Sequence, residues 1–289
     1  AGSLGVQLPS CIGATSIQPD GTHCSNPDLH SFVSIPAAGL AERDSTANAY
    51  PDCPISTRDS GEVKVCKFEN PGANIRVALV GDSHANQYVA AADLAGRHAN
   101  WNVDVITKGG CPLSLTQRAQ DATLTKSCTA WVANVLDYLE REKYDVVVTS
   151  MKSGVDWQAG KDPVAGIEAA LRRVVDAGSA VLYIKDNPRP LSTVADCLKG
   201  NQGREPGDCV AAKAQAFKDE PALSAIANLN SNRVATANWD DLYCQSANCW
   251  PIIGEVIVYR DDNHLTNTWV KTLYPRFEEA VSALLRARG

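Results

Sequence analysis

The feature that most constrains the fold of this chain is an alternation of short apolar runs with amphipathic stretches, which begins at residue 75. A short apolar run is typical of a buried strand, and apolar residues three or four positions apart are typical of a helix. We expect strands at 75–81, 101–107, 145–150, 180–186 and 232–239. We expect helices at 85–99, 122–144, 163–178, 209–230 (with a break near Pro221) and 266–288. Strands that alternate with helices predict an α/β fold of three layers, α/β/α, around a mostly parallel, five-stranded sheet.

Ten cysteines set a second constraint. They lie in successive pairs with short gaps and form no Cys-x-x-Cys motif, which disfavours a zinc site. An even number favours up to five disulfides, formed in an oxidising compartment. The sequence does not fix their connectivity; the pairing that we expect joins neighbours, namely Cys11 with Cys24, Cys53 with Cys66, Cys111 with Cys128, Cys197 with Cys209 and Cys244 with Cys249. We expect no metal and no cofactor.

The first 70 residues lack the alternating pattern. They are rich in Pro, Ser, Gly and Asp, and they carry four of the cysteines without a sustained helical period. A free linker would not need four cysteines. We therefore interpret residues 1–70 as an irregular, disulfide-rich extension that packs on a domain formed by residues 71–289.

Charge and hydropathy exclude several classes of partner. The chain has 27 basic and 33 acidic residues, a net charge of −6, and no cluster of Lys and Arg, which argues against nucleic acid and against a polybasic membrane patch. The sequence contains no run of 18 apolar residues, the length that is needed to span a bilayer. The first residues, AGSLGVQLPS, do not resemble a signal peptide, so we expect a mature product or a piece of a longer protein.

The stretch IRVALVGDSHANQY, residues 75–88, places a Gly-Asp-Ser-His turn directly after the first expected strand. The carboxyl ends of parallel strands are where such sheets carry their active sites. A serine needs a base within hydrogen-bond reach to act as a nucleophile, and the N–H groups at a helix N-terminus can stabilise an oxyanion. Two interpretations are open at this point: Ser83 is a nucleophile, or Asp82 or Ser83 only caps the following helix.

The stretch YRDDNHLTNTW, residues 259–269, offers Ser83 a base. His264 lies in a polar loop before the last expected helix, with Asp261 three residues upstream. A carboxylate at this spacing can hold the imidazole Nδ1 and leave Nε2 able to take a proton. Alternatively the loop is only a polar lead to the helix, with Asp262 or Asn263 as its cap. The order Ser83, Asp261, His264 spans almost the whole α/β region, and the combination is more specific than either motif.

Several blocks of this sequence, in order, resemble those of a known family. VALVGDSH and YRDDNHLT resemble the first and last blocks of the SGNH (GDSL-like) hydrolase superfamily, and in particular the SGNH domains attached to membrane acyltransferase-3 proteins. Intervening segments are also similar to that branch: KGGCPLS (108–114), YIKDNPRP (183–190) and the Cys-x₄-Cys segment that begins at Tyr243. The resemblance covers about residues 53–289 and implies an SGNH, flavodoxin-like fold, with residues 71–289 as its catalytic domain.

The resemblance also implies roles for individual residues. Ser83 would be the nucleophile, His264 the base and Asp261 the acid that orients it, and the N–H groups of Ser83 and of Gly110 or Gly109 would form the oxyanion hole. The superfamily's third block supplies an Asn to this hole, but the corresponding stretch here, VVVTSMKSGVDW, contains none. Either Ser150 or a nearby N–H replaces it, or the hole has two donors, at a cost of about 100- to 1000-fold in rate.

Candidate substrate-binding residues flank these blocks. Asp82, Lys152 and Trp157 are candidates for the acceptor groove, against the simpler interpretation of an exposed lysine and a packed tryptophan. Trp250, Tyr259 and Trp269 are candidates for stacking on a sugar, against plain packing.

Three functions follow as hypotheses. The first is an extracytoplasmic O-acyltransferase, acetyl being the expected group, which receives the acyl group from a membrane acyltransferase-3 domain upstream in the same chain and transfers it to a cell-envelope glycan or glycolipid. The second is a carbohydrate O-acetylesterase with the same residues, and the third is a non-catalytic module that binds envelope glycan. For both enzymes we expect activity to rise with pH through the range in which histidines titrate.

Overall fold

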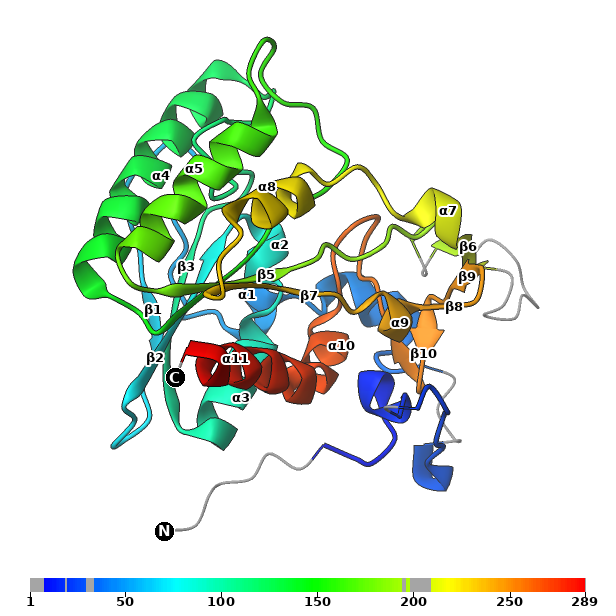
Figure 1. Cartoon of the computed structure of the whole chain (residues 1–289). Helices are drawn as coiled ribbons and strands as arrows, with labels where there is room; N and C mark the ends of the chain where they lie inside the picture. Colours follow the sequence, from blue (N-terminus) through cyan, green and yellow to red (C-terminus); the bar gives the residue numbers. More distant parts are fainter. Residues whose placement is uncertain (1–7, 19, 30–33, 194–195, 198–208, 289) are drawn as a thin grey trace. The chain divides into compact units, whose positions relative to one another are not determined.

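The computed structural model describes residues 8–18, 20–29, 34–193, 196–197 and 209–288 (Figure 1). Two compact units make up the chain. The sheet unit consists of Asp52–Asp186, Asp219–Asn238 and Arg276–Gly289. The loop-rich unit consists of Ala1–Pro51, Asn187–Lys218 and Trp239–Pro275.

The sheet unit is built on a six-stranded sheet with the strand order β1-β3-β2-β4-β5-β7. The strands are β1 (Cys66–Phe68), β2 (Ile75–Gly81), β3 (Trp101–Thr107), β4 (Val146–Ser150), β5 (Ala180–Ile184) and β7 (Val234–Ala237). Only β1 pairs antiparallel, with β3, and the other pairings in this sheet are parallel. The predicted α/β fold with a mostly parallel sheet is therefore confirmed, and β1 is an edge strand that the sequence pattern did not indicate.

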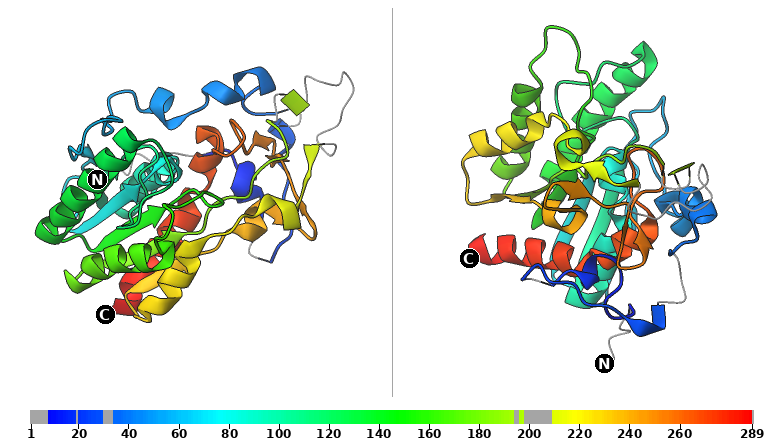
Figure 2. Two further views of the ribbon diagram at one scale, coloured as in Figure 1. Left: turned by 90° about the horizontal axis from the view of Figure 1, so that it is seen from above. Right: turned by 90° about the vertical axis from the view of Figure 1, so that its right-hand side faces the viewer.

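Helices cover both faces of this sheet (Figures 1 and 2). On one face lie α4 (Ala122–Glu142), α5 (Pro163–Asp176) and α8 (Pro221–Leu229), whose apolar side chains form one buried cluster with those of the strands. On the other face lie α3 (Val89–Ala99) and α11 (Tyr274–Arg288). Gly96 of α3 packs so closely on Val103 of β3 that an added Cβ would lie 2.7 Å from the valine methyl.

The ends of the helices follow from local chemistry. The Asp121 carboxylate accepts the Leu124 N–H at 3.0 Å and begins α4, which ends at Lys143 in the left-handed conformation. Pro163 is the first residue of α5, and the Asp162 carboxylate caps it. The periodic apolar residues of α4 are buried against the sheet, so the helical spacing in the sequence was a sound guide.

Two predicted helices are interrupted. The stretch 85–99 consists of the short α2 (Ser83–Asn86) followed by α3, and the stretch 266–288 consists of α10 (Asn267–Thr272) followed by α11. The α2–α3 break separates the turn that carries Ser83 from the helix that packs on the sheet.

The helix predicted at 209–230 is wrong in its first half. Residues Ala211–Ala212 form β6, which pairs with β9 (Asn248–Cys249), and only the single turn α7 (Lys213–Ala216) follows before α8. The alanine-rich sequence favours a helix, but pairing with a distant strand overrides that preference. Helix α8 begins at Pro221, whose missing N–H suits a first helical position.

Among its described residues, the loop-rich unit has short elements only. Its helical turns are η1 (Gly13–Ser16), η2 (Pro27–Leu29), η3 (Ala38–Arg43), α1 (Thr46–Ala49), α7, α9 (Asp240–Tyr243) and α10. Its strands form a three-stranded sheet of β6, β9 and β8 (Cys244–Gln245) and a hairpin of β10 (Ile252–Ile253) and β11 (Val256–Ile257).

Disulfide bonds join all ten cysteines. The pairs are Cys11–Cys24, Cys53–Cys66, Cys111–Cys128, Cys197–Cys209 and Cys244–Cys249, as expected from the sequence. In the part of the chain that the structure describes, none of the helices combines the length and the apolar character needed to cross a membrane.

Candidate active site

The turn that carries Ser83 depends on a glycine at the end of β2. Gly81 has φ of 145°, a conformation that side chains disfavour. An added Cβ there would lie 2.9 Å from the Ser150 carbonyl oxygen and 2.9 Å from the Ala85 Cβ. The glycine therefore allows the chain to turn directly from β2 into α2, which places Ser83 at the carboxyl edge of the sheet.

Asp82 caps α2, and Ser83 is the first residue of that helix. The Asp82 Oδ1 accepts the His84 N–H at 2.8 Å, while its Oδ2 accepts the Lys152 N–H at 3.1 Å and contacts the Arg118 guanidinium. The carboxylate is fully buried. Burial by itself raises the pKa of Asp82, but Arg118 and the other donors outweigh it and lower the pKa, so this carboxylate is ionised. The cap interpretation thus applies to Asp82, and half-buried Ser83 is not the cap.

A second buried carboxylate holds the residue after Ser83. The His84 Nδ1 lies 2.6 Å from the Asp186 Oδ1, and both side chains are fully buried. The Asp186 Oδ2 accepts the Ser153 N–H at 2.8 Å and its hydroxyl at 2.7 Å. Sequence reasoning missed Arg118, His84 and Asp186 as parts of the site. The only available signal was the position of His84 and Asp186 within blocks that already resembled the family.

The Gly109–Gly110 turn follows β3. The Lys108 N–H donates to the Gly81 carbonyl at 3.0 Å, which ties the start of this turn to the end of β2. The Lys108 side chain is fully buried and its ammonium contacts the Thr57 carbonyl, and burial lowers its pKa. Among the described residues, the Gly109 and Gly110 N–H groups have no hydrogen-bond acceptor. They are therefore available to a ligand oxygen.

Three backbone N–H groups of the turn after β4 already donate hydrogen bonds. Those of Lys152, Ser153 and Gly154 donate to the Asp82 carboxylate, the Asp186 carboxylate and the Asp219 carbonyl. Ser150, the last residue of β4, is fully buried, and its hydroxyl has no partner within the described ranges.

The other residues considered for substrate binding differ in exposure. The side chains of Lys152 and Trp157 are half-exposed, and Trp157 also packs against the core of the sheet unit. Tyr259 and Trp269 are buried, and Trp269 contacts the Tyr243 ring, so plain packing describes both; Trp250 is half-exposed.

Asp261 and His264 form a hydrogen-bonded pair within the loop-rich unit. The Asp261 Oδ2 lies 2.9 Å from the His264 Nδ1, and its Oδ1 accepts the His264 N–H at 2.6 Å and the Asn263 N–H at 2.9 Å. Burial raises the pKa of Asp261, but the contacts with His264 outweigh it and hold the pKa well below its usual range. The carboxylate therefore favours the tautomer that carries its proton on Nδ1, and the His264 Nε2 can accept a proton.

The start of the segment 187–218 supports the His264 loop. The Asn187 amide donates to the Asn263 carbonyl at 3.0 Å, and the Arg189 guanidinium donates to the same oxygen at 3.2 Å. The loop is thus held by a contact within it, between Asp261 and His264, and by two side chains of another segment, Asn187 and Arg189.

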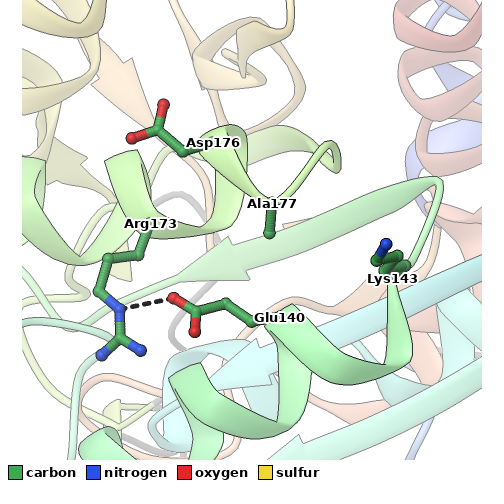
Figure 3. A pocket seen from close by; sticks show the side chains of 5 residues that line it. All are labelled: Glu140, Lys143, Arg173, Asp176 and Ala177. Atoms are coloured by element: carbon green, nitrogen blue, oxygen red, sulfur yellow. Dashed lines mark hydrogen bonds and ion pairs between the residues drawn. The ribbon is translucent and has the colours of Figure 1, made fainter.

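A shallow surface pocket lies on the sheet unit, away from Ser83. It has a volume of about 520 Å³ and is lined by Glu140, Lys143, Arg173, Asp176 and Ala177 (Figure 3). These residues lie at the carboxyl ends of α4 and α5, which lead into β4 and β5, and therefore at the sheet edge opposite Ser83. Arg173 is already paired with Glu140 at 2.6 Å, so this is a surface ion-pair region and we assign it no catalytic role.

Glu220 permits a prediction about stability. Its carboxylate accepts the Tyr183 hydroxyl at 2.6 Å and the Asp186 N–H at 2.8 Å, and burial raises its pKa from the usual 4.5 to about 7. Between these pH values the folded chain holds a proton that the unfolded chain releases. The free energy of unfolding therefore falls as the pH rises from about 4 to about 7. Glu220→Gln keeps an acceptor oxygen and should remove up to about 3 kcal/mol of this decline.

Urea unfolding at pH 5 and pH 8 measures the effect. The exposed Glu279 provides a control, because Glu279→Gln should leave the difference between the two pH values unchanged. An equal difference in wild type and Glu220→Gln would contradict the raised pKa.

A family model described as "SGNH domain (fused to AT3 domains)" matches residues 52–279. Among solved structures, the periplasmic domain of a lipopolysaccharide acetyltransferase from Salmonella ser. Paratyphi A is similar, with a TM-score of 0.57 and 15% sequence identity over 74% of this chain and 85% of that one. At this identity the likeness shows a shared fold. No curated protein matches the chain.

Proposed function

The chain belongs to the family of SGNH domains fused to AT3 domains, and on that premise we propose that it is an extracytoplasmic O-acyltransferase domain. The acyl group, acetyl in the first instance, is carried on Ser83 and passed to a hydroxyl of a cell-envelope glycan or glycolipid. The membrane AT3 domain, upstream in the same chain, supplies the acyl group. In this proposal residues 71–289 form the catalytic domain and residues 1–70 are its lead-in.

The proposed reaction has two steps. The Ser83 Oγ attacks the acyl carbonyl and passes its proton to the His264 Nε2, and the same proton then goes to the leaving group as the tetrahedral intermediate collapses. In the second step His264 takes the proton of the acceptor hydroxyl, whose oxygen attacks the acyl-enzyme, and the proton returns to Ser83. Asp261 holds the imidazole in the required tautomer throughout.

The observation that carries this proposal is the contact between Asp261 and His264. Its 2.9 Å distance to Nδ1 gives the imidazole the orientation and tautomer of a general base. The resemblance of the blocks around Ser83 and His264 to the family's first and last motifs supports Ser83 as the nucleophile that this base serves.

For the oxyanion hole we propose the backbone N–H groups of Ser83 and of Gly109 or Gly110. The N–H groups of residues 152–154 are engaged by other acceptors, and Ser150, with its buried and unpartnered hydroxyl, is the candidate for a third donor. A hole with two donors slows acyl transfer by about 100- to 1000-fold relative to three.

Two features support the location. The five disulfides require an oxidising compartment, and the structurally similar protein is a periplasmic domain. The proposed acceptor-side residues are half-exposed Lys152 and Trp157, with buried Asp82, whose carboxylate accepts the Lys152 N–H.

Mass spectrometry of the acyl-enzyme tests the proposal. The chain is incubated with p-nitrophenyl acetate and quenched in acid, and we expect a single added acetyl group that maps to Ser83. Acceleration of p-nitrophenol release by an added glycan, with acetyl found on the glycan, supports transfer. Acetate release that no glycan affects supports the esterase. If neither an adduct nor any turnover is detected, both enzyme functions are excluded and the glycan-binding module is the remaining hypothesis.

A further inference from the structure

Two buried carboxylates hold the residues on either side of Ser83. Asp82 is itself one of them, and it accepts the His84 N–H. The other is Asp186, which contacts the His84 ring at 2.6 Å. All three side chains are fully buried, whereas Ser83 between them is half-buried.

Asp186 joins the ends of three adjacent strands. It follows β5, its Oδ1 contacts His84 after β2, and its Oδ2 accepts both donors of Ser153 after β4. Asp82 makes a similar connection, because it contacts Lys152 after β4 and Arg118 from the loop after β3. The two carboxylates together connect the carboxyl ends of β3, β2, β4 and β5.

Stability alone gives little reason for such an arrangement. Burying a charged pair costs several kcal/mol of desolvation, and well-packed apolar residues of similar volume often do as well or better. A buried, hydrogen-bonded pair does fix the orientation of its two side chains, because its hydrogen bonds have one satisfactory geometry. The residue that gains a fixed backbone from these contacts is Ser83, whose own N–H is part of the proposed oxyanion hole.

We propose that His84 and Asp186 are a positioning pair, which fixes the Ser83 backbone against the turn after β4 and takes no part in proton transfer. This inference rests on the proposed function of Ser83. A shift of about 1 Å in a reacting group lowers catalysis by about 100-fold, so loss of the pair should appear in kcat and leave KM nearly unchanged.

The double variant His84→Leu/Asp186→Leu tests the inference, because it removes both members of the pair at once, together with the acceptor of the Ser153 N–H and hydroxyl. We expect kcat for p-nitrophenyl acetate to fall about 100-fold, KM to change less than about threefold, and the affinity for a boronic acid that forms a tetrahedral adduct on Ser83 to fall in parallel with kcat. Asp186→Asn can still accept from Ser153 and donate to His84, so it should retain kcat within about fivefold.

A matched control removes another buried polar pair of the same unit. The Tyr144 hydroxyl donates to the Asp104 carboxylate at 2.5 Å, and Asp104 lies on β3, three residues before that strand ends. The double variant Tyr144→Phe/Asp104→Leu should change the free energy of unfolding and leave kcat within about twofold. A fall in kcat equal to that of the His84/Asp186 variant would mean that any buried pair has this effect, and would overturn the inference.

Hydrogen exchange provides a readout that needs no activity. Peptides over residues 81–88 and 150–154 should exchange faster in the His84/Asp186 variant, and the rest of the sheet should not. A folded variant with unchanged kcat and unchanged exchange in both peptides overturns the positioning role. If wild type lacks any turnover that depends on Ser83, the proposed function fails, and the exchange arm still decides whether the pair fixes this turn.

Discussion

Replacement of Ser83 by alanine is expected to lower the release of p-nitrophenol from p-nitrophenyl acetate by about 10⁴-fold or to background. Without the hydroxyl no acyl-enzyme forms, and His264 can at best activate a water that is poorly placed. The fold should not suffer, because Asp82 and not Ser83 caps α2. The comparison is made by steady-state kinetics, with circular dichroism to confirm folding.

Ser179→Ala is the matched control for this prediction. Ser179 is a buried serine whose hydroxyl has no partner in the described part of the chain, and it precedes β5 at the opposite edge of the sheet. Its replacement should leave the rate within about twofold. Equal rates for wild type and Ser83→Ala would remove both enzyme hypotheses and favour the binding module.

Asp261→Asn should lower kcat by about 10³- to 10⁴-fold. An amide in place of the carboxylate favours the other imidazole tautomer, so that the proton occupies Nε2, where His264 must accept one. The Asp261 pKa is lowered in the folded chain, so the wild-type carboxylate is ionised at neutral pH and this loss should be present throughout the pH range 6 to 9. Kinetics at several pH values measure it.

A neighbouring carboxylate gives the control for Asp261. Asp262 lies in the same loop, is exposed, and contacts only the Asn263 side chain among the contacts that the structure describes. Asp262→Asn should change kcat by less than about threefold. If the two variants lose activity equally, the effect belongs to the charge of the loop and not to the contact with Nδ1.

The sequence predicted most strands of the central sheet well, because their apolar segments have clear ends. The segments 75–81 and 101–107 match β2 and β3 to the residue, since both are rich in Val and Ile and are bounded by polar or glycine residues. Buried parallel strands produce this pattern, and the helices between them indicate a mostly parallel sheet.

Two local predictions, the helix at 209–230 and the absence of a strand at β1, failed for physical reasons that lie outside the local sequence. The helix expected at 209–230 was lost to the pairing of Ala211 with Cys249, a contact between residues 38 positions apart that local propensity cannot reveal. The strand β1 was hidden because three residues between turns carry no periodic signal.

The candidate site was only partly accessible from the sequence. Asp261 and His264 are three residues apart, and their contact is local enough to infer from spacing. The contacts of His84 with Asp186 and of Asp82 with Arg118 join residues 102 and 36 positions apart. No spacing rule predicts them.

The arrangement of the five disulfides has a consequence for how the chain acquires them. Each bridge joins two cysteines that follow one another along the sequence, with separations of 5 to 17 residues. A chain that crosses a membrane from its N-terminus exposes its thiols in that same order. An oxidase that links each new thiol to the one before it would produce the native set, and no bond would have to be exchanged later. Correct oxidation can therefore be complete before the sheet, whose strands are far apart in the sequence, has assembled.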